Sequence, residues 1–154
     1  MSAAPQNTLL IAGASGVIGA GAVEHFARLA DWRVITLSRR APLVDADCAF
    51  THVPVDLTDA AACAEAVAAM PQVTHLIYAA VAEAPGLVGG WRDPDVMALN
   101  GVMFENLLRP LATSGHLRHV SLLQGAKAYG AHVHAVTLPL RENAPRDQHD
   151  NFYW

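Results

Sequence analysis

The stretch TLLIAGASGVIG, residues 8–19, decides the fold of this chain. It begins as a short apolar run that a glycine stops, which predicts a buried strand over 8–13. Apolar residues at helical spacing then run from Val17 to Ala30 and predict a helix directly after the turn. A strand, a glycine-rich turn and a helix in this order are typical of the first βα unit of a parallel sheet.

The rest of the chain continues this alternation of apolar runs and helical patterns. It predicts the α/β class, with a Rossmann-type, doubly wound parallel sheet that stops after the fifth strand and the loop following it. We divide the chain into a cofactor-binding domain, 1–130, and an active-site loop, 131–154, because the latter has little periodicity. Further strands are expected at 32–38, 50–57, 74–80 and 117–125, and further helices at 59–70 and 93–112.

Composition excludes several classes of protein. With 154 residues, 53% of them hydrophobic, the chain can bury the core of one domain. The net charge of −4 argues against nucleic-acid binding, and no apolar run approaches the roughly 20 residues of a membrane helix. The N-terminus, MSAAPQN, does not resemble a secretory signal, so we expect a cytoplasmic protein.

Metal binding is not expected. Cys48 and Cys63 lack metal-type spacing and are interpreted as buried free thiols. The HVH stretch at 132–134 lacks further ligands at suitable spacing for zinc.

The turn after the first strand predicts a dinucleotide site. Gly13, Gly16 and Gly19 allow a tight turn, a close approach of the backbone to a pyrophosphate, and close packing of helix on strand. The helix N-terminus adds free N–H groups and a favourable dipole for the phosphates. The predicted cofactor contacts in this turn are Gly13, Ser15, Gly16, Val17, Ile18 and Gly19.

The end of the second strand selects the dinucleotide. An acidic residue here would bind the ribose 2′-hydroxyl of NAD, whereas arginine accommodates the 2′-phosphate of NADP. The sequence has Ser38, Arg39 and Arg40, with no acidic residue before Asp45. Paired guanidinium groups can clamp a phosphate, so we predict NADP(H).

The next two strand ends supply the remaining cofactor contacts. Asp56 lies where an adenine amino group would arrive, and Leu57 is expected to pack on the ring, whereas Asp59 is interpreted as the start of a helix. Small residues at the end of the fourth strand leave room for the cofactor. Here the predicted contacts are Ala79, Ala80 and Val81.

Lys127 is the only lysine of the chain, and three tyrosines could act with it. Tyr78 lies in an apolar strand and is expected to pack. Tyr129 would point away from Lys127 if the segment is extended. Tyr153 follows the long loop. The Tyr-x-x-x-Lys pair of short-chain dehydrogenases is absent, because position 123 is a leucine.

Seven stretches together resemble the atypical short-chain dehydrogenase/reductases related to plant progesterone 5β-reductase and iridoid synthase. The lysine turn combined with NFYW is the most specific part of the resemblance, since the glycine motif is shared by the whole superfamily. The stretches are GASGVIG (13–19), SRR (38–40), VDLTD (55–59), THLIYAA (74–80), LLQGAKAYG (122–130), RENAPR (141–146) and NFYW (151–154).

The resemblance implies NADPH-dependent reduction of the C=C bond of an enone or enal, with a small α,β-unsaturated carbonyl compound as substrate. Lys127 and Tyr153 match the family's catalytic positions: the phenol would bind the developing enolate oxygen, and the lysine would bind the nicotinamide ribose and lower the phenol pKa. Gln124 is expected to face the nicotinamide. A homodimer is left open.

The chain ends one residue after Tyr153, whereas members of this family continue with substrate-binding segments. We therefore interpret it as the N-terminal, cofactor-binding part of a reductase. Two alternatives remain: a sugar-nucleotide epimerase or dehydratase, which shares the glycine motif, and a non-catalytic NADP(H)-binding sensor.

Overall fold

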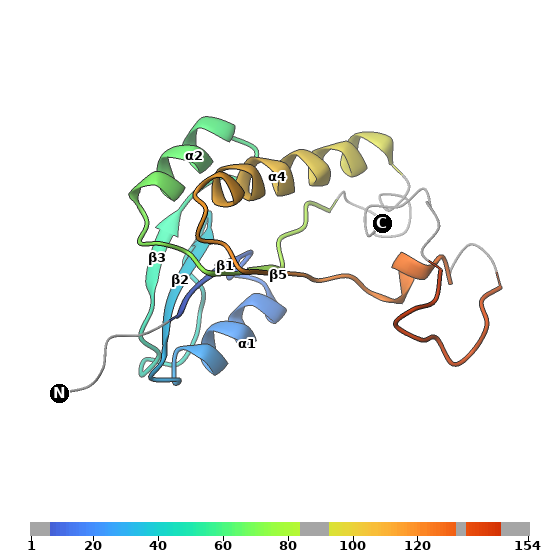
Figure 1. Cartoon of the computed structure of the whole chain (residues 1–154), viewed down its shortest axis with the longest axis horizontal. Helices are drawn as coiled ribbons and strands as arrows, with labels where there is room; N and C mark the ends of the chain where they lie inside the picture. The colour runs from blue at the N-terminus through green and yellow to red at the C-terminus, as the bar shows by residue number, and fades with distance from the viewer. Residues whose placement is uncertain (1–6, 84–92, 132–134, 146–154) are drawn as a thin grey trace. The chain divides into compact units, whose positions relative to one another are not determined.

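The computed structural model describes residues 7–83, 93–131 and 135–145 (Figure 1). The chain divides into two compact units, one of residues 1–81 and 102–122 and the other of residues 82–101 and 123–154. The first unit holds the whole sheet and most of the predicted cofactor contacts. Tyr153, Trp154 and the HVH stretch lie outside the described residues.

The first unit is built on a parallel sheet of five strands in the order β3-β2-β1-β4-β5. Ala12 at the end of β1 is in register with Leu37 of β2 and Tyr78 of β4, so the carboxyl ends of these strands lie at one edge. The order, with β1 at the centre and the chain moving outward in both directions, confirms the doubly wound Rossmann-type sheet. The strands are β1 (Asn7–Ala12), β2 (Trp32–Ser38), β3 (Thr51–Pro54), β4 (His75–Tyr78) and β5 (His119–Leu122).

Helices cover both faces of this sheet. Helix α1 (Val17–Phe26) lies on one face, and α2 (Ala60–Ala69) lies on the other with residues 102–113 of α4 (Pro94–Thr113) (Figure 1). The strands alternate accordingly, because successive side chains point to opposite faces. Under α1 the buried core consists of Leu9, Ile11, Ala14, Val23 and Val34. Leu10, Leu37, Leu76, Leu107 and Leu111, each at most 1% exposed, belong to the remaining core.

Several elements are shorter than the sequence predicts; strand β4, for example, covers only 75–78 of the predicted 74–80. Helix α1 ends at Phe26, because the Leu29 N–H bonds back to the Phe26 carbonyl and the chain turns towards β2. Strand β3 ends at Pro54, which lacks the N–H needed to continue the ladder. Strand β5 covers only 119–122 of the predicted 117–125.

Three further features concern the protein's class. Both cysteines are free thiols, but Cys48 is half-buried rather than buried as predicted. Within the described ranges, no helix is long and apolar enough to cross a membrane. The same ranges contain no group of three or more metal-ligating side chains.

Candidate nucleotide-binding site

The three glycines of the turn between β1 and α1 have two different roles. A Cβ atom on Gly13, whose φ is +78°, would lie 2.5 Å from the Ala80 nitrogen, and one on Gly19 would lie 2.3 Å from the Gly13 carbonyl oxygen. The protein itself therefore requires glycine at both positions. At Gly16 a Cβ would meet only the Gly13 oxygen, at 3.4 Å, and the backbone is extended with φ −84° and ψ 164°. Packing does not explain why position 16 is glycine.

The same turn leaves the N-terminus of α1 free to bind an anion. Gly16 is the N-cap residue and has no side chain with which to cap the helix, and the first intrahelical bond runs from the Ala20 N–H to the Gly16 carbonyl. The N–H groups of Val17, Ile18 and Gly19 thus have no partner within the helix. The side chains of Val17 and Ile18 are 92% and 63% exposed, so this end of α1 faces solvent. Such a terminus favours phosphate through both its dipole and its N–H donors.

At the end of β2, the hydroxyl of Ser38 shapes the turn that carries the two arginines. Ser38 is 8% exposed, and its Oγ donates a hydrogen bond of 2.7 Å to the Arg40 carbonyl. The hydroxyl is therefore already used by the turn, and Ser38 is better suited to holding the arginines than to binding phosphate. Arg39 and Arg40 are both exposed beyond it.

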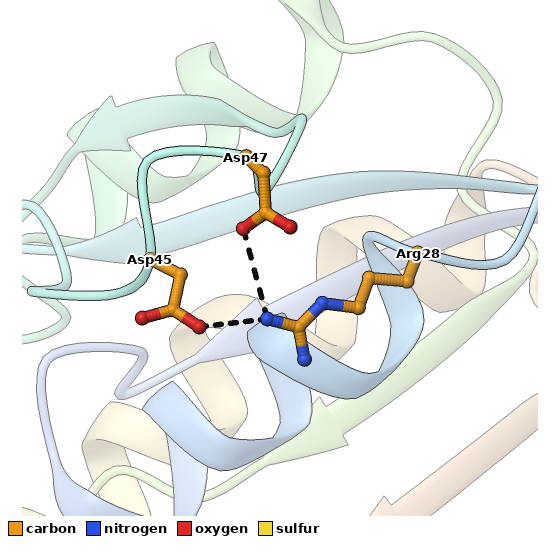
Figure 2. Close-up of polar contacts among 3 residues, drawn as sticks. All are labelled: Arg28, Asp45 and Asp47. Atoms are coloured by element: carbon orange, nitrogen blue, oxygen red, sulfur yellow. Dashed lines mark hydrogen bonds and ion pairs between the residues drawn. The ribbon is translucent and has the colours of Figure 1, made fainter.

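The loop that follows the arginines is tied to the end of α1. The guanidinium of Arg28 lies 2.7 Å from an Asp45 carboxylate oxygen and 3.6 Å from one of Asp47 (Figure 2). These carboxylates raise the Arg28 pKa, first through the hydrogen bond to Asp45. All three side chains are well exposed, so the pairs are screened by water and salt.

Shortly after β3, Asp56 is an exposed residue of a hydrogen-bonded turn. Its Oδ1 accepts bonds from the Thr58 N–H (3.0 Å) and the Thr58 hydroxyl (2.8 Å), and these bonds lower the Asp56 pKa. Asp59 caps α2 through the Ala62 N–H, as predicted. Leu57 is 5% exposed, so its side chain packs inside the protein and offers little surface to an adenine ring, contrary to our expectation.

Beyond the end of β4, the chain passes close to the glycine turn. The Ala79 N–H bonds to the Ala12 carbonyl, and the Ala80 backbone is what a Cβ on Gly13 would strike. Val81 is 45% exposed. Ala82 belongs to the second unit, where the Asn100 side chain accepts a bond from its N–H (2.8 Å) and donates one to its carbonyl (2.9 Å).

The predicted catalytic residues belong to the second unit. Lys127 lies in a short 3₁₀ helix, η1 (Ala126–Tyr129), so the segment containing Tyr129 is coiled and not extended. This corrects the reason given for setting Tyr129 aside. Gln124 precedes η1 and is exposed. Tyr153 lies outside the described residues. Tyr78 is 4% exposed and packs edge-on against Phe104, which confirms its role in the core.

One polar contact of the turn between β3 and α2 was not predicted from the sequence. Asn106 of α4 donates a hydrogen bond of 2.9 Å to the Leu57 carbonyl, 49 residues away in the sequence. An asparagine in the middle of a helix is not distinguished by spacing or composition, so no local pattern could have pointed to it.

Comparison with known proteins assigns the family. Residues 9–151 match the model of the NAD dependent epimerase/dehydratase family, and the chain belongs to that family. The family description supports a nicotinamide dinucleotide as the ligand of the site described above.

Among individual relatives, the chain is similar to an (S)-8-oxocitronellyl enol synthase of Antirrhinum majus, at 29% identity over 97% of this chain and 39% of the relative. It is also similar to a short chain dehydrogenase of Penicillium aethiopicum, at 27% identity over 96% of this chain and 40% of the relative. The chain thus spans about two fifths of the length of these relatives. They bear out the resemblance to iridoid synthases.

Solved structures share the fold. The enzyme WbmG of Bordetella bronchiseptica, in complex with NAD, superposes with a TM-score of 0.70 at 19% identity, covering 94% of this chain and 45% of that one. A UDP-glucose 4-epimerase gives a TM-score of 0.72 at 18% identity, covering 96% and 43%.

Proposed function

We propose that this chain is the cofactor-binding part of an NADPH-dependent reductase that acts on the C=C bond of a small enone or enal. The observation that carries the cofactor assignment is Gly16. Its glycine is required neither by packing nor by backbone conformation. A pyrophosphate bound at the uncapped N-terminus of α1 would explain why residue 16 is glycine. A methyl group at position 16 would hold the phosphates away from the N–H donors of the helix.

The choice of NADP(H) over NAD(H) rests on the end of β2. Arg39 and Arg40 are exposed on a turn that the Ser38 hydroxyl holds in place. Two guanidinium groups on a preorganised turn can bind a 2′-phosphate with less loss of conformational entropy than two arginines on a free loop. Asp56 would then accept a hydrogen bond from the adenine amino group.

For the reaction, bound NADPH supplies a hydride to the β-carbon of the conjugated carbonyl compound. The chain's own contribution falls to Tyr153, whose phenol would hydrogen-bond the carbonyl oxygen as negative charge develops there. Lys127 would hold the nicotinamide ribose and keep a positive charge near that phenol. These two roles rest on the resemblance of the lysine turn and NFYW to the enone reductases.

The proposal is tested with deuterium-labelled NADPH and a simple enal. Reduction should place the label on the β-carbon, and both Lys127→Met and Tyr153→Phe should slow it. A label recovered on the carbonyl carbon would contradict the 1,4-addition.

A sugar-nucleotide epimerase is the alternative that the family description favours. It is disfavoured by Leu123, which stands where the Tyr-x-x-x-Lys pair requires tyrosine. Turnover of a UDP-hexose without net consumption of cofactor would support it instead.

A further inference from the structure

The turn that carries Asp56 is held from two sides. On the side of α2, the Asp56 carbonyl accepts two hydrogen bonds. One comes from the N–H of Asp59, the N-cap of α2, at 3.1 Å, and the other from the thiol of Cys63 at 3.8 Å. On the other side, the Leu57 carbonyl accepts the side-chain amide of Asn106 at 2.9 Å. Consecutive carbonyl groups of one turn are thus bonded to two different helices.

Asn106 projects from a part of α4 that is fixed by packing. Its neighbours Met103 and Leu107 are 8% and 0% exposed, so this part of the helix is anchored in the core. A side-chain donor on such an element holds its acceptor more firmly than a donor on a loop does. The bond to Leu57 transmits that rigidity to the β3–α2 turn.

The carboxylate of Asp56 is oriented by the same turn. Both bonds from Thr58 are accepted by Oδ1, so Thr58 does not engage the second carboxylate oxygen. The charge of Arg39, on the turn proposed to bind the 2′-phosphate, also lowers the Asp56 pKa, though less than the two hydrogen bonds from Thr58 do. The direction of the carboxylate depends on the backbone from Asp56 to Thr58, which includes the peptide group that Asn106 binds.

We propose that Asn106 is a positioning residue for the base of the dinucleotide: by holding the Leu57 carbonyl, it aims the Asp56 carboxylate at the 6-amino group of adenine. This inference rests on the proposed function, since it assumes that an adenine dinucleotide binds at this edge. Asn106 acts through the turn and does not itself touch the ligand.

The test compares two ligands that differ at the base. Reduced nicotinamide hypoxanthine dinucleotide phosphate carries a carbonyl where NADPH carries the 6-amino group, so it cannot donate to Asp56. Asn106→Asp keeps the shape of the side chain but replaces the donor with an acceptor facing the Leu57 carbonyl. We expect the affinity of the full 154-residue chain for NADPH to fall about five- to tenfold, the loss typical of one hydrogen bond, while affinity for the hypoxanthine analogue changes little.

Two further variants make the result decisive. Asn106→Ala removes the donor without introducing a carboxylate and should give the same pattern if Asn106→Asp does not fold. Glu105→Gln, on the adjacent exposed position of α4, is the matched control and should bind both ligands as the wild type does.

The outcomes separate the two proposals. Equal losses for both ligands, or no loss for either, in a variant that folds would overturn the positioning role of Asn106 alone. Failure of the folded wild-type chain to bind NADPH would overturn the proposed function and this inference with it.

Discussion

The three glycines of the β1–α1 turn should respond differently to alanine. At Gly19 the new Cβ would lie 2.3 Å from the Gly13 carbonyl oxygen, about 1 Å short of ordinary contact, and 2.7 Å from the Ala14 Cα. Both obstacles are backbone atoms, so relief requires α1 to move away from the turn. Overpacking of this kind costs about 3 kcal/mol at the upper end of its usual range. That corresponds to a fall in melting temperature of roughly 6–12 °C for a chain of this size.

At Gly16 the expectation is the reverse. The Cβ would make an ordinary 3.4 Å contact, and the backbone conformation suits alanine. Lower entropy of the unfolded chain stabilises the variant by about 0.4–1 kcal/mol. Loss of glycine at the N-cap position opposes this gain by a comparable amount. Gly16→Ala should therefore melt close to the wild type yet lose most of the thermal stabilisation that NADPH confers.

The assay is thermal unfolding of Gly16→Ala and Gly19→Ala with and without NADPH. Equal destabilisation of the ligand-free protein by Gly16→Ala and Gly19→Ala would contradict the two different roles assigned to these glycines. A full shift in melting temperature on NADPH addition to Gly16→Ala would likewise contradict a role of this glycine in ligand binding.

Three smaller predictions concern the scaffold. The Tyr78 hydroxyl is buried and has no hydrogen-bond partner among the described residues, so Tyr78→Phe should raise the free energy of unfolding by up to about 1 kcal/mol in denaturant titrations; a loss of stability would contradict this. Burial, followed by the charges of His119 and Arg118, lowers the pKa of His75 in the folded protein below its ordinary value of 6.5. The unfolded chain therefore binds a proton at His75 more tightly than the folded protein does. The free energy of unfolding should fall as the pH drops below 6.5. His75→Phe should make this decline shallower in melting curves from neutral to mildly acidic pH, and an unchanged profile would argue against it. Arg28→Ala should lower the melting temperature slightly in low salt but not in high salt, where the exposed pairs with Asp45 and Asp47 are already screened; an equal loss in both would show a packing role.

The sequence predicted where the strands lie along the chain better than it predicted where each strand ends. Strand β2 has the predicted bounds, Trp32–Ser38, and is flanked by strands on both sides, so its apolar run is continuous. Strands β3, β4 and β5 are all shorter than predicted, although β4 is also flanked by strands on both sides. The end of a strand is determined by local details such as Pro54 after β3, which a hydrophobicity pattern does not reveal.

In the candidate site, too, some features could be predicted from the sequence and others could not. The glycine turn was predictable because a local spacing encodes a local geometry, and the Cβ contacts at Gly13 and Gly19 confirm the tight packing. By contrast, the burial of Leu57 and its bond from Asn106 depend on α4 packing over the β3–α2 turn. That packing is a tertiary property, and no window of sequence around either residue contains it.

We propose that NADP(H) binds at the edge of the sheet where β1, β2 and β3 end. The most direct test is calorimetric titration of the 154-residue chain with NADPH and with NADH, alongside Arg39→Ala/Arg40→Ala. We expect the wild type to bind NADPH more tightly than NADH. The double substitution should weaken NADPH binding by about tenfold or more, while NADH binding stays nearly unchanged, because only the 2′-phosphate contacts are lost. A folded wild-type chain that binds neither dinucleotide, or an arginine variant that binds NADPH as tightly as the wild type, would contradict it.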